Sequence, residues 1–390
     1  MQIIEVIDQQ DGRDFLAVNA LMNAHNPAYI RALDNEVNEV FDPKKNKHYK
    51  YGEAKRWIAK SETGELLGRV AAFVNNKYIN KGTSFATGGI GFFDCINDQA
   101  TANTLLDTAK AWLQEKGMEA MDGPINFGDR DKWWGLMIEG FDKEPMYGMS
   151  FNPPYYKDLL EGYGFQNYYN QYYYHMNVDD ELPARFTERY ERFNNKPDYS
   201  AKHVKLSELE KYAGDFATVY NAAWAQHGEA KEITKEQVVK LFQKMKPIMD
   251  ERVVWFAYYK EEPIAMFINI PDLNQYFKHF NGKFGLWQKL HLLWMKWTSA
   301  NKRLTGMAFG VVPKYQSLGI DSYLIYACGL HMRGKGWYYE YEMGWAGEWN
   351  PKMVNIYKSL GGSQSRLMAT YRYIFDYKYS FERHPEMEYK

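Results

Sequence analysis

The segment VVPKYQSLGID, from Val311 to Asp321, decides how the chain folds around it. The two valines end an apolar run that is typical of a strand, and Pro313 stops the strand because it has no backbone N–H to donate. Gly319 then opens a helix. The N–H groups of a first helical turn have no partner in the helix, and the helix dipole adds positive potential there. The segment therefore predicts an anion site suited to a pyrophosphate, which Gly319 allows close to the backbone.

The elements around this segment predict a mixed sheet covered by helices. A polar turn separates the first two apolar runs, which is the signature of a hairpin. In chain order the patterns predict strands at 253–259, 263–270 and 303–312, a helix at 319–333, a strand at 338–343, a helix at 351–360 and a strand at 369–375. This order indicates an α/β fold, or an α+β fold with a mixed sheet.

The N-terminal half predicts the same order. Its patterns indicate strands at 54–58, 68–74 and 87–93, a helix at 100–116, a strand at 120–125, a helix at 153–163 and a strand at 168–178. In each half an Asn-Pro pair opens the last helix and a glycine follows its end, as proline and glycine prefer. These pairs are Asn152 with Gly164 and Asn350 with Gly361. The match is compatible with a duplication.

A charged stretch with two prolines, residues 179–198, separates the halves and predicts a connecting helix and linker. We therefore expect an N-terminal domain at 1–180, a linker at 181–200 and a C-terminal domain at 201–390. The loop of the first domain that corresponds to 311–321 runs from Phe92 to Asp98 and has two acids and no Gln-x-x-Gly. We expect this domain to be a degenerate, structural copy that helps to form the pocket of the acceptor.

At the residues Val311 to Asp321 the chain resembles the acyl-CoA motif of the GNAT superfamily of N-acyltransferases, V-x-P-x-[YF]-[QR]-x-x-G-x-[GA]. A second segment, from Asn350 to Gly362, is similar to the family's N-x-x-A-x-x-x-Y-x-x-x-G-F. Tyr357 falls at the matching position, whereas Gly362 stands in place of the aromatic residue. The two motifs together cover roughly residues 305–375. The resemblance implies two tandem GNAT-like domains with the working site in the second one.

The resemblance also implies roles for individual residues. Val311 and Val312 would pair with the pantetheine arm of acetyl-CoA or another acyl-CoA. The strand before the loop would splay from the strand after it to admit the thioester. Tyr357 would protonate the leaving thiolate, a suitable task because a phenol and a thiol have close pKa values. Asn350 would belong to the catalytic group. The backbone amides that would hold the pyrophosphate belong to Gln316, Ser317, Leu318, Gly319, Ile320 and Asp321.

Two features depart from the family or are left open by it. Asp321 stands where the family has Gly or Ala, and its carboxylate suits the helix dipole but repels a pyrophosphate if it turns inward. The strand that ends at Val312 has no carboxylate to act as general base. Glu340, Glu342 and Glu348, on or after the next strand, are the candidates, and we select Glu342. The competing interpretation is that alternating glutamates on a strand face solvent.

Composition narrows the class of protein. Lys and Arg number 48 and Asp and Glu 49, for a formal net charge of −1, which gives no case for nucleic acid as a partner. Two cysteines, Cys95 and Cys328, predict buried thiols and a reducing, cytoplasmic location. No metal-ligand spacing, signal peptide or apolar run of about 20 residues is present, so we expect no metal and no transmembrane segment.

Residues 284–302 predict an amphipathic helix with an apolar face and a basic flank. The face consists of Leu286, Leu290, Leu293, Trp294 and Trp297, and the flank of Lys289, Lys296 and Lys302. Two interpretations are open. The helix packs on the other half or covers the acceptor pocket, which we favour, or it makes weak contact with a membrane surface.

The function that these patterns support best is transfer of an acetyl group from acetyl-CoA to a primary amine of a small molecule or peptide, by direct attack. Positioning and polarisation of the carbonyl would supply most of the catalysis. One alternative is an aminoacyl-tRNA-dependent transferase of the Fem type, which also has tandem GNAT-like halves. The other is a catalytically degenerate GNAT fold that only binds a ligand.

Overall fold

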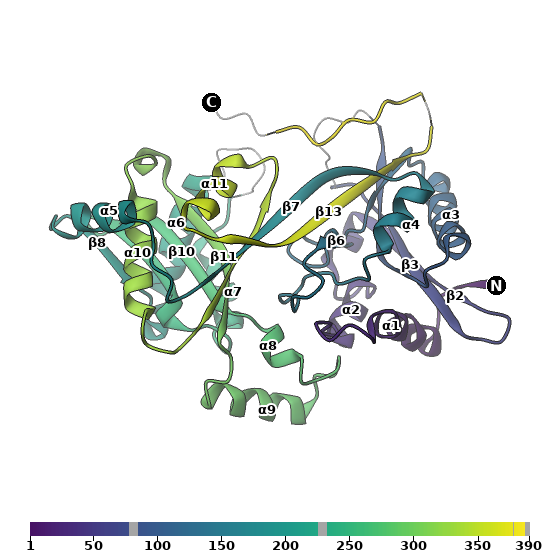
Figure 1. Ribbon diagram of the computed structural model, residues 1–390, viewed down its shortest axis with the longest axis horizontal. Coiled ribbons are helices and arrows are strands. Elements are labelled where there is room, and N and C mark those ends of the chain that lie inside the picture. Colours follow the sequence, from purple (N-terminus) through teal and green to yellow (C-terminus); the bar gives the residue numbers. More distant parts are fainter. Residues whose placement is uncertain (78–84, 225–231, 377, 387–390) are drawn as a thin grey trace.

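The computed structural model describes residues 1–77, 85–224, 232–376 and 378–386. In this structure the two halves share one large twisted sheet with helices on both faces (Figure 1). The strands are β1 (Gln2–Glu5), β2 (Gly52–Lys60), β3 (Leu66–Asn75), β4 (Thr87–Cys95), β5 (Ala120–Gly123), β6 (Leu136–Glu139), β7 (Gln166–Asn177), β8 (Tyr199–His203), β9 (Val254–Tyr259), β10 (Glu262–Pro271), β11 (Arg303–Val311), β12 (Glu340–Gly347) and β13 (Ser363–Ile374).

The helices cover each half in the same way. They are α1 (Gln9–Asn23), α2 (Asp34–Val40), α3 (Gln99–Glu115), α4 (Tyr156–Tyr163), α5 (Ala184–Asn194), α6 (Leu209–Trp224), α7 (Lys235–Met245), α8 (Asn274–Phe277), α9 (Leu286–Trp297), α10 (Ile320–Met332) and α11 (Pro351–Ser359). In the N-terminal half, α3 and α4 share a core with one face of the sheet and α1 and α2 with another. In the C-terminal half, α10 and α11 share one core and α6 and α7 another.

The two halves repeat one order of elements. The order β1-α1-α2-β2-β3-β4-α3-β5-α4-β7 returns as β8-α6-α7-β9-β10-β11-α10-β12-α11-β13, with β6, α5, α8 and α9 as additions. The predicted fold class, a mixed sheet in two tandem α/β halves, is confirmed. β12 runs four residues past its predicted end because a bulge near Gly344 interrupts the alternation of its side chains. β13 begins at Ser363 rather than at 369 because its first residues pair with β7.

The halves exchange their last strands. The strands are ordered β1-β2-β3-β4-β5-β13-β7-β12-β11-β10-β9-β8, with β6 paired beside β13. β13 therefore lies between β5 and β7 of the N-terminal half, and β7 lies between β12 and β13 of the C-terminal half. These two long strands run side by side from one half to the other (Figure 1). The division of the chain at residues 181–200 remains a prediction, because each exchanged strand has partners in both halves.

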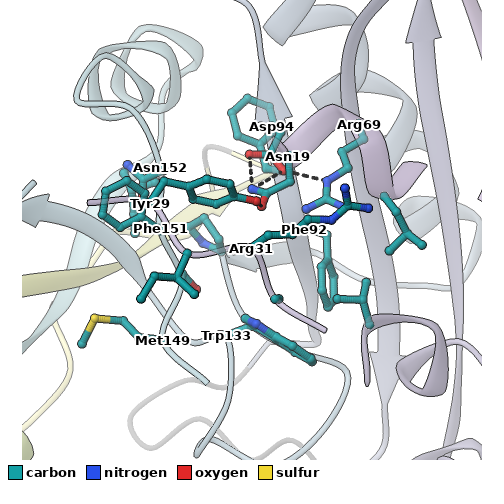
Figure 2. Close-up of a pocket in the computed structure, with 18 of the residues that line it drawn as sticks. Asn19, Tyr29, Arg31, Arg69, Phe92, Asp94, Trp133, Met149, Phe151 and Asn152 are labelled. Atoms are coloured by element: carbon teal, nitrogen blue, oxygen red, sulfur yellow. Dashed lines mark hydrogen bonds and ion pairs between the residues drawn. The ribbon is translucent and has the colours of Figure 1, made fainter. Parts of the chain in front are cut away.

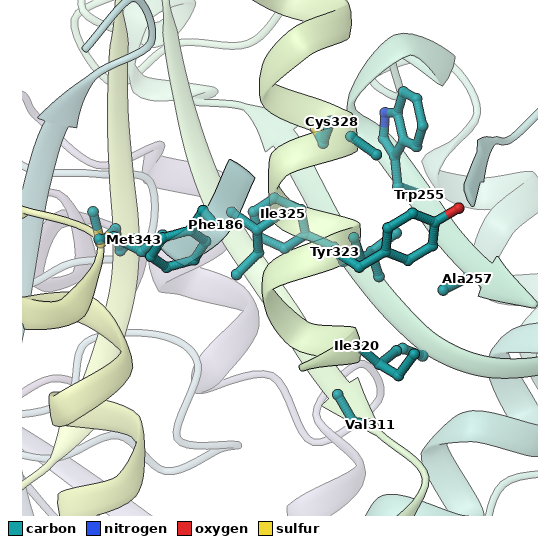
Figure 3. Close-up of a cluster of buried hydrophobic side chains, with 14 of the residues drawn as sticks. Phe186, Trp255, Ala257, Val311, Ile320, Tyr323, Ile325, Cys328 and Met343 are labelled. Atoms are coloured by element: carbon teal, nitrogen blue, oxygen red, sulfur yellow. The ribbon is translucent and has the colours of Figure 1, made fainter. Parts of the chain in front are cut away.

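A buried core fixes α10 on the sheet of the C-terminal half (Figure 3). Ile320 and Leu324 of α10 are fully buried, and Phe186 of α5 packs into the same cluster. The connecting helix α5 thus packs against α10, where the stretch 179–198 predicted a linker helix. Burial of such side chains stabilises the fold by about 1.5–3 kcal/mol each.

A second set of contacts joins the halves below the exchanged strands. Asp272, at the end of β10, is fully buried and accepts two hydrogen bonds from Arg303, with its Oδ2 2.8 Å from Nε and 2.6 Å from Nη2. The other oxygen of Asp272 accepts from the backbone N–H of Tyr147, 3.0 Å away, in the N-terminal half. Neither charge is left unpaired in the interior, as buried ions require.

Helix α9 departs from the favoured expectation that its apolar face packs on the protein. Met295 is its one buried residue, and this side packs on a cluster that includes Phe277 and Phe280. The face predicted from periodicity is exposed instead, with Leu286 at 72% and Trp297 at 83% of full exposure. Within the described parts of the chain, no helix has the length and apolarity that crossing a bilayer requires.

The exchanged strand β13 should depend on its ion pair with β5. Asp122 and Arg372 are buried and bonded at 2.7 and 2.8 Å. Asp122→Ala leaves Arg372 charged and without this carboxylate, so it should lower the free energy of unfolding by about 3–5 kcal/mol. Urea unfolding followed by tryptophan fluorescence measures the change. Asp376→Ala, which removes an exposed partner of Lys378, is the control and should leave the midpoint unchanged. Equal midpoints for the two variants would contradict this role.

Candidate functional site

The C-terminal half contains a gap between two parallel strands. β11 and β12 pair only over three residues each, Arg303–Thr305 with Glu340–Glu342, and then separate. The bulge in β12 falls at this point, where Gly344 has a φ of +68°. Met307 and Trp345, just beyond it on the two strands, are 52% and 37% exposed. The predicted splay of the strands before and after the 311–321 loop is therefore present.

The start of α10 faces the open end of this gap with free backbone donors. Gly319 caps the helix with a φ of +94°, and Ser317 also has a positive φ, of 61°. No side chain caps the helix. Among the described residues, no acceptor bonds to the amides of Ser317, Leu318, Gly319, Ile320, Asp321 or Ser322. Such a row of donors at a helix start fits an anion such as a pyrophosphate.

Val311 and Val312 direct their backbone N–H and C=O groups to opposite sides of the strand. The N–H of Val312 donates to the carbonyl oxygen of Ile264 on β10, 2.9 Å away, so it faces the neighbouring strand and not the gap. Alternate residues of a strand direct their backbone groups to opposite sides, so those of Val311 face the gap. The carbonyl oxygen of Val311 accepts from Nε2 of Gln316 at 3.0 Å. This bond closes the loop, and it leaves the amide of Val311 as the group able to pair with a ligand.

An arginine that the motif did not include lies at the same helix start. Arg189 of α5 donates to Oγ of Ser322 at 2.8 Å. Its side chain covers Gly319 so closely that a Cβ added there would lie 3.0 Å from Cδ of Arg189. The arginine is otherwise exposed and can turn toward an anion. Its position in the connecting helix gave no sequence signal, because only the packing of α5 on α10 brings it to the site.

Tyr357 lies at the point where the strands separate. It is 6% exposed on α11, and its ring lies 5.6 Å from that of Tyr174. A Cβ added to Gly344 would be 3.9 Å from its hydroxyl oxygen. Burial, with a smaller effect of Tyr173, raises the pKa of Tyr357 far above its ordinary value. The raised pKa keeps its hydroxyl group protonated. Among the described residues this group has no hydrogen-bond partner, so it is free to donate.

Asn350 and Glu342, the other two residues selected from the sequence, are bonded to groups of the protein itself. Oδ1 of Asn350 accepts from the N–H of Met353 at 3.1 Å and caps α11, the helix that carries Tyr357. Glu342 is 3% exposed and its Oε1 lies 2.9 Å from Nη1 of Arg366. Burial alone would raise the pKa of Glu342, but His175 and Arg366 outweigh it and hold it at about 2. Such a low pKa suits a permanent carboxylate better than a group that accepts protons.

His175 is a neighbour of Glu342 that the sequence did not reveal. It lies on the exchanged strand β7, with its Nδ1 3.6 Å from Oε1 of Glu342. Its side chain is 29% exposed, whereas that of Glu342 is 4% exposed. A histidine oriented by a buried carboxylate and reached by solvent is a common arrangement for proton transfer. The strand exchange creates this pair, since β7 belongs to the other half of the chain.

An apolar cavity adjoins the paired end of the gap. Its space is about 520 Å³ including the part open to solvent, and Leu304 and Tyr341, a cross-strand pair before the separation, line it. Gly329 of α10 also lines it, and a Cβ added there would meet nothing within 4 Å. Cys328 lines the cavity too, and burial raises the pKa of its thiol, which therefore stays protonated. The remaining lining comes from Met176, Asn177, Val178, Asp180, Leu182, Phe267, Asn269, Ile325, Met332, Arg333 and Leu360.

A second pocket, of about 740 Å³ including the part open to solvent, lies in the N-terminal half (Figure 2). Its charged groups satisfy one another. Nε of Arg69 lies 2.6 Å from Oδ2 of Asp94, Asn19 donates to both oxygens of that carboxylate, and the hydroxyl group of Tyr29 donates to Asn19 at 2.7 Å. This network offers no free charge to a ligand and holds α1 on the sheet.

In the N-terminal half, hydrogen bonds close the space between the parallel strands β4 and β5 and cap the start of α3. β4 and β5 also pair over only three residues, but the N–H of Ile125 then donates to the carbonyl oxygen of Ile90 at 2.8 Å and closes the space. Asp98 caps α3 and accepts from the N–H of Thr101 at 2.8 Å. A carboxylate thus already occupies the helix start that would bind a pyrophosphate. That the N-terminal half is a structural copy remains a prediction.

Two curated proteins are similar to this chain over most of their length. No family model matches the sequence. The chain is 24% identical over 377 residues to the bacterial ceramide synthase of Caulobacter vibrioides, covering 95% of this chain and 97% of that protein. It is 24% identical over 323 residues to the protein YghO of Escherichia coli, covering 80% and 78% of the two chains.

Two solved structures share the fold. A tandem GNAT protein from the clavulanic acid biosynthesis pathway has a TM-score of 0.54 at 10% identity, over 96% of this chain and 98% of that one. A GCN5-related glucosamine N-acetyltransferase region of a fungal multidomain β-N-acetylglucosaminidase has a TM-score of 0.55 at 11% identity. This chain spans 38% of that longer protein, with 95% of its own length aligned. The chain therefore has a tandem GNAT-like fold, as the motifs predicted.

The ion pair of Glu342 should make stability depend on pH. Its folded pKa of about 2 lies below the ordinary value of 4.5, so its contribution of roughly 3 kcal/mol is complete above about pH 5. The contribution should disappear as the pH falls toward 2. Glu342→Gln should therefore be less stable than the parent at pH 7, and this difference should shrink steadily between about pH 5 and pH 2. Urea unfolding at several pH values measures it, and a difference independent of pH would contradict the pairing.

Proposed function

We propose that this protein is an N-acyltransferase that uses an acyl-CoA thioester and attaches the acyl group directly to an amine. One observation carries the proposal. Two parallel strands separate at Gly344, an uncapped helix start faces the open end of the gap, and the free hydroxyl group of Tyr357 lies at its closed end. The similarity to a ceramide synthase and the fold shared with a glucosamine N-acetyltransferase region support the same class of reaction.

The groups around the gap fit a CoA ester. The free amides of residues 317–322 and the guanidinium of Arg189 would hold the pyrophosphate, and the amide of Val311 would pair with the pantetheine arm. Asp321, which departs from the family motif, precedes Ser322 in the first turn, and Arg189 is bonded to Ser322. Arg189 would offset the repulsion between this carboxylate and the pyrophosphate.

Tyr357 would act as the general acid. Burial raises its pKa and so removes the close match with a thiol that free groups have, but it keeps the proton on the phenol at neutral pH, where the hydroxyl group would donate to the departing sulfur. His175 would accept the proton that the amine loses on attack, with Glu342 as the residue that orients its ring. Asn350 would act as a positioning residue, because it caps the helix that carries Tyr357. No covalent intermediate with the enzyme is needed, since the amine attacks the thioester itself.

We further propose that the donor is a long-chain acyl thioester and the acceptor an amine with an alkyl chain. A ceramide is the amide of a fatty acid with a long-chain amino alcohol, and the similar protein of Caulobacter vibrioides is a synthase of such amides. The apolar cavity beside Leu304 and Tyr341 gives an alkyl chain a place that an acetyl group does not need. Burying each methylene there would stabilise the complex by about 0.8 kcal/mol.

Tyr357→Phe tests the reaction. The variant should bind a long-chain acyl-CoA as tightly as the parent in a calorimetric titration. Its turnover with a long-chain amino alcohol should fall about 100-fold, because it loses a general acid. Release of free thiol measures turnover. Tyr174→Phe, which removes the hydroxyl group of the ring beside it, is the matched control and should keep most of the activity. A fully active Tyr357→Phe would contradict the assignment, and absence of CoA binding in the parent would contradict the donor.

Gly329→Leu tests the acyl cavity. A side chain at this helical position meets open space, so the variant should fold and should fill the cavity from one side. Its kcat/KM with a 16-carbon acyl-CoA should fall at least tenfold relative to a 4-carbon acyl-CoA, since methylenes lose their pocket. Gly329→Ala is the control, because a single methyl group leaves most of the space. An unchanged ratio between the two donors would show that the chain binds elsewhere.

A further inference from the structure

Helix α9 carries an exposed apolar surface that the acyltransfer site does not use. Its six largest apolar side chains on the solvent side are between 49% and 83% exposed: Leu286, Trp287, Leu290, Leu293, Trp294 and Trp297. Single exposed apolar residues are normal, but a contiguous group of this size marks an interaction site. The helix lies at the periphery of the molecule, apart from the central sheet (Figure 1).

The six side chains form one continuous stripe. With 3.6 residues per turn, they fall within about 120° of the helix circumference. Met295 and the partly buried Leu292 project from the opposite side, where they pack on the cluster that contains Phe277 and Phe280. The helix is therefore held on the protein by its inner side and presents its more apolar side outward. Near its C-terminal end Lys296 donates to the carbonyl oxygen of Pro247, and at its start the side chain of Gln288 caps the helix by accepting from the N–H of Gly285.

The segment of chain that carries the stripe is basic, whereas Asp34 lies beside Gly282 and Asp250 acts on Lys296 from other segments. Residues 273–320 contain seven Lys and Arg and no Asp or Glu, which leaves 41 basic and 49 acidic residues in the rest of the chain. Lys283 and Lys289 are exposed and form no ion pair with any described residue. Lys296 flanks the stripe on the same side as Lys289. An apolar stripe with tryptophans and a lysine border is the pattern of a helix that lies in the interface of a bilayer.

The stripe belongs to an addition to the repeated fold. Helices α8 and α9 fill the connection from β10 to β11, whereas the equivalent connection in the N-terminal half, between β3 and β4, is residues 76–86. The repeat explains every other helix of the C-terminal half except α5. A rigidly seated insertion with its apolar side toward solvent therefore has a purpose other than completing the core.

We propose that α9 docks this protein on an anionic lipid surface, with the tryptophans and leucines in the interface and the lysines against the headgroups. The lysines around the stripe favour an anionic lipid surface over a second copy of the protein. A second copy would bring an equally basic surface against this one, and like charges across an interface are unfavourable. Anionic headgroups complement the lysines, and each lysine near such a surface strengthens partitioning roughly fivefold. The inference goes beyond the proposed function, and its test requires no turnover.

Vesicle flotation of the full-length protein tests the docking. The probes are vesicles of phosphatidylcholine alone and of phosphatidylcholine mixed with phosphatidylglycerol. The parent should float with the mixed vesicles and much less with the neutral ones, and salt should weaken its binding. Trp287→Ser combined with Trp297→Ser should reduce the bound fraction at least tenfold. Lys283→Glu combined with Lys289→Glu should do the same on the mixed vesicles.

The side chains changed are exposed, so the variants should keep the fold, which circular dichroism checks. Ile7→Ser, which removes an apolar side chain that is 83% exposed on another part of the protein, is the matched control and should float like the parent. Size-exclusion chromatography completes the test. A parent that fails to float would overturn the proposal, and so would a dimer that the tryptophan substitutions convert to a monomer. Loss of acyltransfer with intact flotation would overturn only the proposed function.

Discussion

The exchange of β7 and β13 is the constraint on which the rest of the structure depends. Without it, each half would hold a sheet split between its fifth and last strands, with backbone donors and acceptors unpaired along both sides. Each half satisfies them with the last strand of the other. The exchange also builds the site, because β7 brings His175 to Glu342 and β13 brings Arg366 to the same carboxylate. Neither half alone contains this set of groups.

The two halves show how little separates a binding gap from a closed one. Both have parallel strands that pair over three residues and then diverge. In the N-terminal half a backbone hydrogen bond from Ile125 bridges the divergence, and the carboxylate of Asp98 occupies the helix start. In the C-terminal half Gly319 adopts a left-handed conformation and leaves the helix start uncapped. A cap stabilises a helix by about 1 kcal/mol, so the uncapped start of α10 is a cost that a bound anion would offset.

Local sequence patterns predict most of the helices and strands and the location of the gap, because neighbouring residues determine where helices start, where the chain turns and where strands end. The motif at 311–321 predicts the helix α10, and the spacing of the second motif selects Tyr357 as a candidate residue. What depends on contacts between distant residues was not predictable in this way. The strand exchange, Arg189 from the connecting helix and His175 from the other half gave no local signal. Glu342 was selected as a base from its place on a strand, but its partner Arg366 comes from the exchanged strand and holds its pKa low. For α9 the periodicity identified the apolar face correctly, yet periodicity alone does not reveal what covers a face.

Helix α10 extends from the site proposed for the phosphates of the donor to the cavity proposed for its alkyl chain. The helix has 13 residues, which at 1.5 Å per residue extend about 20 Å. Its first turn offers the free amides, and Ile325, Cys328, Gly329 and Met332, farther along the helix, line the apolar cavity. A long-chain thioester laid along this helix would thus place its phosphates at the start and its alkyl chain toward the end. Tyr357 would then lie between them, where the strands separate and the sulfur must leave. An acetyl donor would engage only the first half of this track, so the apolar second half is the feature that a longer acyl chain explains.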